Sequence, residues 1–192
     1  MNIFQTQSID HVGAGDLLIS EPLLPDFNFS RSVVLICEEK DDTHFGFVIN
    51  KSLKESCLED MISDVETFHK EVYLGGPVDQ NYLQCIYRGH SDISNSLELK
   101  NGFFWGGDFD EIIVKIKSGE ADIDDFWFFL GYSAWGPGQL RDELEENSWL
   151  VCQWNLSDYM SIPEDQKWKR AILSLGKEYE LMSRFPADSR LN

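Results

Sequence analysis

The sequence predicts a single α+β domain covering residues 1–192, and three observations support that prediction. The length of 192 residues is typical of one domain of ordinary to large size. Hydrophobic residues make up 42% of the chain, and 13 Phe, 6 Trp and 6 Tyr supply the bulk of a substantial core. Short strand-like runs alternate with a few segments of helical periodicity, and no repeat, low-complexity tract or Pro/Ser-rich linker separates them.

Strands are predicted where β-branched and aromatic residues lie between Gly, Pro, Asp or Asn. In chain order these runs are residues 17–19, 32–37, 45–49, 71–74, 83–88, 102–105, 125–130 and 148–154. The link at 41–44 is rich in turn-forming residues and indicates a hairpin. The run at 125–130 is aromatic enough to predict a central strand.

Two helices are predicted in the first two thirds of the chain. Apolar residues at helical spacing predict a short helix at 56–62. Asp108 stands three positions before Glu111, ahead of an apolar periodic pattern, which indicates an N-cap with a capping-box-like partner. Gly119 is positioned to end this helix in the left-handed conformation.

Two further helical regions follow. One is predicted at about 138–146, after the glycine-rich segment 131–138. Pro163 opens the other, where Trp168, Ile172 and Leu175 recur at helical spacing. Gly176 is expected to end or kink that helix before residues 178–185.

The charge is strongly negative and unevenly distributed. The formal net charge is −18 and the isoelectric point is about 4.4. Residues 163–192 carry six basic against five acidic side chains, so residues 1–162 carry −19. A duplex-binding protein usually needs a basic face to neutralise phosphates. We therefore expect no direct nucleic-acid binding, and a solvated acidic surface.

Cysteine usage and hydropathy indicate a cytoplasmic protein. The four cysteines lie far apart without a C-x-x-C pair, and three of them fall inside apolar runs, a pattern typical of reduced thiols in a reducing compartment. Residues 1–10 have no basic or apolar segment of a signal peptide. The longest apolar runs are far shorter than the roughly 20 residues of a membrane span.

Several segments, taken in order, resemble the YqgE/AlgH family over about residues 15–192. They are GDLLISEP at 15–22, RSVVL at 31–35, GFVINK at 46–51, LGGPV at 74–78, GGDF at 106–109 and GYSAWGPGQL at 131–140, followed by Leu144, Trp149-Leu150, Trp168, Ala171, Phe185-Pro186 and Asp188. The resemblance implies a bifurcated mixed or antiparallel sheet that includes a small barrel, with helices outside. The AlgH name also implies a link to transcriptional regulation. Because the negative charge of the chain disfavours direct contact with DNA, we expect any such link to be indirect.

The segment 131–140 combines three glycines, a proline and two aromatic residues. Its first five residues superficially resemble the G-x-S-x-G nucleophile elbow, but Trp135 stands where a small residue is needed, so we assign Ser133 no chemistry. The entry through Gly136 to Gly138 offers free backbone N–H groups to an anion, yet acidic residues follow closely. A structural turn is the favoured interpretation.

Other motifs have competing interpretations. Arg31 either binds an acidic ligand or pins the preceding loop through Asp26, and the pin is favoured. Gly75-Gly76-Pro77 lacks dinucleotide-site spacing, which indicates a tight turn. The candidate ligand or partner surface comprises Arg31, Asn50, Gly75, Gly76, Trp135, Gly138 and Gln139.

No catalytic set, metal site or cofactor is predicted, because the four histidines are isolated and lack ligand spacing. Three classes of function remain. The leading hypothesis is a protein that acts through contacts with an unknown protein partner, without catalysis. The others are an indirect transcriptional regulator, and a small-ligand binder or enzyme with a pocket near Trp135 and Arg31.

Overall fold

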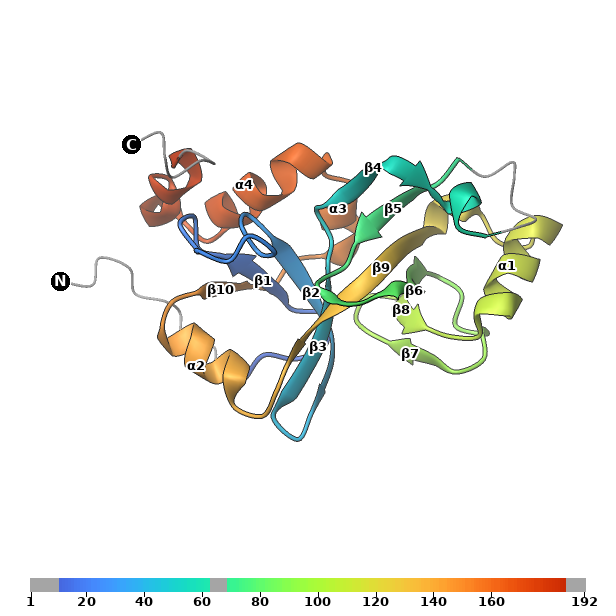
Figure 1. Ribbon diagram of the computed structural model, residues 1–192, viewed down its shortest axis with the longest axis horizontal. Coiled ribbons are helices and arrows are strands. Elements are labelled where there is room, and N and C mark those ends of the chain that lie inside the picture. Colours follow the sequence, from blue (N-terminus) through green and yellow to red (C-terminus); the bar gives the residue numbers. More distant parts are fainter. Residues whose placement is uncertain (1–10, 63–68, 186–192) are drawn as a thin grey trace.

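A computed structural model describes residues 11–62 and 69–185, in which ten strands form one branched sheet surrounded by helices (Figure 1). The strands are β1 (Leu17–Ser20), β2 (Val33–Lys40), β3 (Thr43–Val48), β4 (Ser52–Cys57), β5 (Glu71–Leu74), β6 (Val78–Arg88), β7 (Ser96–Glu98), β8 (Phe103–Gly106), β9 (Phe126–Trp135) and β10 (Trp149–Cys152). The helices are α1 (Phe109–Ser118), α2 (Gln139–Glu145), α3 (Leu156–Met160) and α4 (Glu164–Ser174), with short 3-10 turns at Leu58–Asp60, Ile123–Asp125, Lys177–Tyr179 and Met182–Arg184.

The sheet branches at β9, the strand that crosses the middle of the molecule in Figure 1. The main strand order is β10-β1-β2-β3-β9-β6-β8-β7. The first half of β9 pairs in parallel with β5 and antiparallel with β6, whereas its last residues, from Ser133 to Trp135, pair antiparallel with β3. The predicted α+β class and bifurcated mixed sheet are confirmed, and the expected small barrel corresponds to a strongly curled half-barrel.

Strands β1 and β2 are covered on both faces, which explains their uninterrupted apolar sequence. Leu17 and Ile19 pack in a cluster that includes residues of α3 and α4. Leu18, between them, points to the opposite face and packs in a cluster with Leu140 of α2 and Trp135 of β9. Successive side chains of a strand point to opposite faces, so burying all of them requires helices on both sides.

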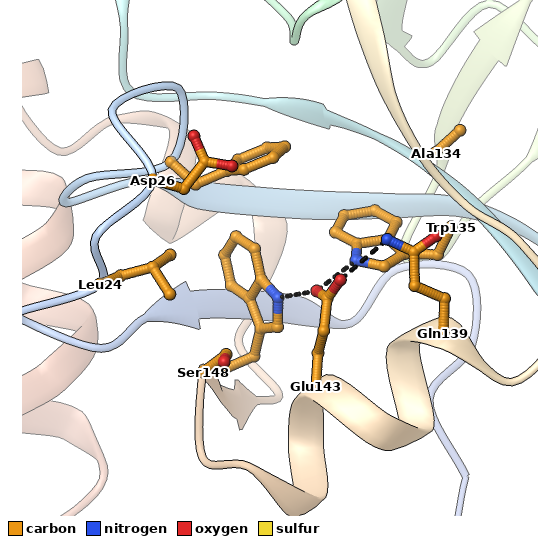
Figure 2. Close-up of a pocket in the computed structure, with 9 residues that line it drawn as sticks. Leu24, Asp26, Ala134, Trp135, Gln139, Glu143 and Ser148 are labelled. Atoms are coloured by element: carbon orange, nitrogen blue, oxygen red, sulfur yellow. Dashed lines mark hydrogen bonds between the residues drawn. The ribbon is translucent and has the colours of Figure 1, made fainter.

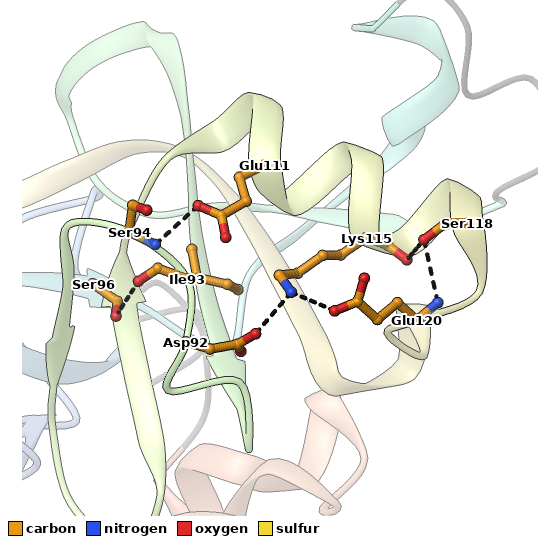
Figure 3. A network of polar contacts seen from close by, with 8 residues as sticks. All are labelled: Asp92, Ile93, Ser94, Ser96, Glu111, Lys115, Ser118 and Glu120. Atoms are coloured by element: carbon orange, nitrogen blue, oxygen red, sulfur yellow. Dashed lines mark hydrogen bonds and ion pairs between the residues drawn. The ribbon is translucent and has the colours of Figure 1, made fainter.

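Helix α1 covers the other half of the sheet, where Ile112 and Ile116 pack against aromatic residues of β6 and β9. The buried ammonium of Lys115 pairs with Asp92 at 2.8 Å and Glu120 at 2.6 Å (Figure 3). These two hydrogen bonds, the one to Asp92 first, raise the pKa of Lys115. The network joins the C-terminal half of α1 to the loop that follows β6.

The helix caps of α1 follow the prediction closely. The Asp108 side chain accepts from the Glu111 backbone N–H at 3.1 Å, and Gly119 ends the helix at φ 76°. The Glu111 carboxylate does not complete the capping box, because it accepts the backbone N–H of Ser94 at 3.0 Å. The hairpin at 41–44 is also confirmed, with Asp41 and Asp42 both at positive φ.

Three element predictions are corrected. Residues 56–62 contain only a three-residue 3-10 turn, because strand β4 extends to Cys57 and pairs with β5 there. Strand β9 continues five residues beyond the predicted 125–130, into the glycine-rich segment. Strands β4 and β7 and helix α3 were not predicted. Each is short: β4 has no strict alternation of apolar and polar residues, β7 has only three residues, and α3 has five.

Some predictions lie outside the described residues. These are the features of residues 1–10 and the family motif positions Pro186 and Asp188. The four cysteines are all described and all free, with Cys37, Cys85 and Cys152 buried and Cys57 partly exposed. None of the helices within 11–62 and 69–185 has the length and apolar character of a membrane-crossing segment.

Candidate functional site: an aromatic pocket and a basic groove

An aromatic pocket of about 250 Å³ lies between the β1–β2 loop, the end of β9, helix α2 and the start of β10 (Figure 2). Its lining comes from all four of these segments: Leu24, Asp26, Phe29, Ala134, Trp135, Gln139, Glu143, Ser148 and Trp149. Three of these residues carry large aromatic rings, and two carry carboxylates. The pocket thus combines apolar walls with negative charge.

The three rings contact one another. Phe29 is stacked on Trp135 with ring centroids 6.2 Å apart, and meets Trp149 edge to face at 5.3 Å. The two indoles meet edge to face at 5.8 Å. Trp135 and Trp149 are only 3% and 1% exposed, whereas Phe29 is half-buried. The indoles therefore form the floor, and Phe29 is the ring that remains open to a ligand.

Glu143 of α2 holds this floor in place. One carboxylate oxygen accepts the indole N–H of both Trp135 (2.8 Å) and Trp149 (2.7 Å). The other accepts from the side-chain amide of Gln139, one helical turn earlier, at 2.8 Å. Hydrogen bonds to a charged acceptor are stronger than neutral ones, so these three bonds fix both indole rings and the carboxylate.

A basic groove of about 310 Å³ lies on the other side of the β1–β2 loop. It is lined by Ser30, Arg31, Asn50, Lys51, Lys54, Glu164, Asp165, Trp168 and Lys169. Four of these side chains are cationic, although the protein as a whole carries −18. The Glu164 carboxylate accepts hydrogen bonds from the backbone N–H and from the hydroxyl of Ser52.

Arg31 is the central cation of this groove. Its guanidinium lies over the Trp168 ring at 4.6 Å and donates to the backbone carbonyl of Phe185. Its Nε is buried without a hydrogen-bond partner, and no carboxylate within 11–62 and 69–185 forms an ion pair with it. Burial lowers the pKa of Arg31. The stack on an indole orients the guanidinium without neutralising its charge.

The backbone at Arg31 has φ 51°, in the left-handed region that a non-glycine residue adopts only at a cost. Asn50 fixes this conformation, because its amide donates to the Arg31 carbonyl at 2.8 Å while its oxygen accepts from Val33 N–H at 2.7 Å. Lys51 donates to the Asn28 carbonyl at 2.7 Å. The β1–β2 loop is thereby anchored from its groove side at two points.

The sequence model of the AlgH-like protein family matches residues 17–180 of this chain. The chain belongs to the AlgH-like family. Among curated proteins it is similar to a UPF0301 protein of Cytophaga hutchinsonii, 39% identical over 179 residues and covering 93% of this chain and 98% of that one. A UPF0301 protein of Bacteroides thetaiotaomicron is 37% identical over 187 residues, covering 96% and 94% of the two chains.

Two solved structures share the AlgH-like fold. A crystal structure of a protein from Corynebacterium diphtheriae has a TM-score of 0.78 at 22% identity and covers 96% of each chain. The solution structure of the AlgH protein from Pseudomonas aeruginosa has a TM-score of 0.73 at 23% identity, covering 97% of this chain and all of that one. At these identities the likeness concerns the fold.

In this AlgH-like chain, the predicted surface residues fall into three groups. Arg31 and Asn50 line the basic groove, and Trp135 and Gln139 line the aromatic pocket. The prediction placed one pocket near both Trp135 and Arg31, whereas these residues line two pockets on either side of the β1–β2 loop. Gly138 is buried at the start of α2, where it has φ 79°.

The prediction that Gly75 and Gly76 belong to a ligand or partner surface is corrected, because both residues are buried. A Cβ at Gly75 would lie 2.3 Å from the Gly131 carbonyl oxygen, and one at Gly76 would lie 2.2 Å from that of Tyr132. The chain after β5 crosses β9 so closely that only glycine fits. The two glycine-rich motifs therefore need each other for packing.

Ser133 is fully buried inside β9, and its hydroxyl donates to the Gly75 carbonyl at 3.1 Å. It lies within a strand and not at a strand-to-helix turn, so the geometry of a nucleophile elbow is not present at Ser133. The pin proposed for Arg31 is wrong in its partner. Asp26 accepts from the Asn28 backbone N–H at 2.8 Å, while Arg31 holds Phe185 instead.

Five residues that complete the two pockets of this chain were not predicted as site residues from the sequence. Glu143 and Trp149 complete the aromatic pocket, and Trp168, Lys51 and Lys169 complete the groove. One local signal was available: Gln139 and Glu143 stand four residues apart and so share a helix face. The other residues come together only through the sheet order, for which the sequence carries no local signal.

Proposed function

We propose that this AlgH-like protein acts by binding and without catalysis, and that its basic groove receives carboxylates carried by a partner protein. One observation supports the proposal above all others. Arg31, Lys51, Lys54 and Lys169 gather in one groove, and none of them forms an ion pair with a carboxylate in the described part of the chain. An acidic protein that concentrates unpaired cations offers a local site for an anion.

The chemistry of the groove fits carboxylate recognition. A guanidinium binds a carboxylate by donating its N–H groups, and Arg31 keeps unpaired donors beside the one that is bonded to the Phe185 carbonyl. Lys54 and Lys169 are exposed, so they add mobile charges at the rim. The described lining contains no histidine or cysteine that would suit acid–base or nucleophilic chemistry.

Apolar exposure on the same loop favours a protein over a small anion. Phe27 is 95% exposed and Leu23 is 47% exposed, and both belong to the β1–β2 loop that borders the groove. Exposed aromatic side chains beside a charged groove are typical of protein interaction sites. The net charge of −18 disfavours a long polyanion such as duplex DNA, so any link to transcription would run through a protein.

A titration of the ¹⁵N-labelled protein tests this proposal. The probes are an acetylated, amidated Leu-Glu-Leu-Glu peptide, the same peptide with Gln for Glu, and inorganic phosphate. We expect the acidic peptide to shift the Trp168 indole resonance, the Gln peptide to leave it in place, and added salt to weaken binding.

Arg31→Gln and Lys169→Gln should each weaken binding of the acidic peptide several-fold or more. Lys169 is exposed and has no described partner, so its variant tests charge without disturbing the fold. Lys117→Gln on α1, also exposed, is the matched control and should bind normally. Equal binding of the acidic and Gln peptides would contradict the proposal, and saturable binding of phosphate alone would replace the protein partner by a small anion.

A further inference from the structure

The aromatic pocket has a different chemistry from the basic groove. Phe29, Trp135 and Trp149 supply its apolar surface, and Asp26 and Glu143 supply two carboxylates, which lie on opposite sides of the pocket in Figure 2. Its described lining contains no lysine, arginine or histidine. The nearest basic residue along α2, Arg141, faces away and pairs with Asp42 at 3.4 Å. No cation belongs to the described lining of the pocket, and Asp26 interacts electrostatically with Lys51 outside it.

The rings add to this negative potential. The face of an aromatic ring carries the negative part of its quadrupole, which attracts cations, and alkylated ammonium groups are recognised in this way. Phe29 is held against both indoles and still remains partly exposed. A cation above Phe29 would contact a ring face, with the Asp26 carboxylate at the rim of the pocket.

The floor of the pocket is rigid before any ligand arrives. Glu143 fixes both indoles through bonds of 2.7 and 2.8 Å, and Gln139 holds the second oxygen of Glu143. A preorganised site loses less conformational freedom on binding. The volume of about 250 Å³ is below that of pockets for drug-sized molecules, so it suits a single functional group.

We propose that the aromatic pocket binds an organic cation, an alkylated ammonium or guanidinium group, between Phe29 and the carboxylates of Asp26 and Glu143. The group belongs either to a free small molecule or to the side chain of another protein. No described residue lines both sites, although the Asp26 carboxylate of the pocket attracts the Lys51 ammonium of the groove electrostatically.

The test follows the indole N–H resonances of Trp135 and Trp149 during titration with three probes. Choline represents a free quaternary ammonium, and N-acetyl-arginine amide represents a protein side chain. The compound 3,3-dimethyl-1-butanol has the shape of choline without the charge. We expect saturable shifts with at least one cation and none with the neutral isostere. Choline alone would indicate a small molecule, and the arginine derivative alone would indicate a protein side chain.

Variants separate a cation site from an apolar hollow. Asp26→Asn keeps the acceptor for the Asn28 N–H and removes the charge, and Phe29→Leu removes the ring while keeping apolar bulk. Each should weaken cation binding several-fold. Asp142→Asn changes an exposed carboxylate of α2 outside the pocket and should have no effect. Equal shifts with the neutral isostere, unchanged affinity in both pocket variants, or no shift with either cation would overturn the inference.

Discussion

The hydroxyl of Ser133 donates to the carbonyl of Gly75, although the two residues lie 58 positions apart in the chain. The same carbonyl accepts the backbone N–H of Val48 at 2.8 Å. The end of β3 and the segment that follows β5 thus meet β9 at one buried point, where the sheet branches. The glycines at 75 and 76 permit this close crossing, because a side chain there would collide with the β9 backbone. Residues that follow the crossing in the chain, Asn50 and Lys51 after β3 and Trp135 at the end of β9, line the two pockets.

The first prediction concerns the space at this crossing. Gly76→Ala should destabilise the protein by about 3 kcal/mol or more, since its Cβ would lie 2.2 Å from the Tyr132 carbonyl oxygen and 2.5 Å from the Ser133 hydroxyl. Backbone atoms at the branch point of a sheet cannot move away cheaply. Chemical denaturation midpoints measure the effect. Gly136→Ala is the control, because its Cβ meets nothing closer than 3.9 Å; similar stability of both variants would refute the close crossing.

The second prediction concerns the Ser133 hydroxyl. Ser133→Ala should cost about 1 kcal/mol, because the variant loses the hydrogen bond from the hydroxyl to the Gly75 carbonyl. The loss stays moderate because Gly75 retains its bond from Val48 N–H. Equilibrium unfolding measures it. A loss above about 3 kcal/mol would mean that the hydroxyl has a larger structural role than one shared carbonyl allows.

The third prediction concerns Trp135, which is only 3% exposed. Trp135→Ala should cost about 3–5 kcal/mol, because it empties a ring-sized space between Phe29 and Trp149. Trp135→Phe keeps a ring and loses the bond to Glu143 and part of the indole volume, so it should cost less. Thermal and denaturant unfolding of both variants measure which of them loses more stability. Equal losses would assign the effect to the indole N–H.

The fourth prediction concerns Lys167, a 1% exposed lysine that donates to the Ile49 carbonyl at 3.2 Å near the rings of Tyr73 and Tyr159. Burial lowers the pKa of Lys167 to about 8, opposed in part by Glu164 and Glu71. Between that value and the ordinary lysine pKa of about 10.4, the unfolded chain binds more protons than the folded one. Stability therefore rises with pH across this window.

The measurable quantity is the difference in unfolding free energy between the wild type and Lys167→Met. It should shift in favour of the wild type by about 1–3 kcal/mol between pH 7 and 10. Tyr73 and Tyr159 have raised pKa values through burial and titrate in both proteins, so the comparison removes most of their contribution. A difference that does not change with pH would show that Lys167 keeps its charge when buried.

The sequence by itself determined the local elements with strong periodicity or capping. Asp108 and Gly119 mark the ends of α1, and the apolar runs of β1 and β2 mark strands covered on both faces. These features depend on residues close in the chain, so their physical causes are readable there. The ordered motifs also determined the AlgH-like family.

The tertiary structure alone decided where the sites lie. Arg31 meets Trp168 because α4 packs over the start of β2, and Trp135 meets Trp149 because both flank α2. The predicted strand ends at residue 130, whereas pairing with β3 extends β9 to Trp135. Long-range strand pairing and close backbone crossings decide these outcomes. Their free energies depend on residues far apart in the chain, for which a single sequence carries no periodic signal.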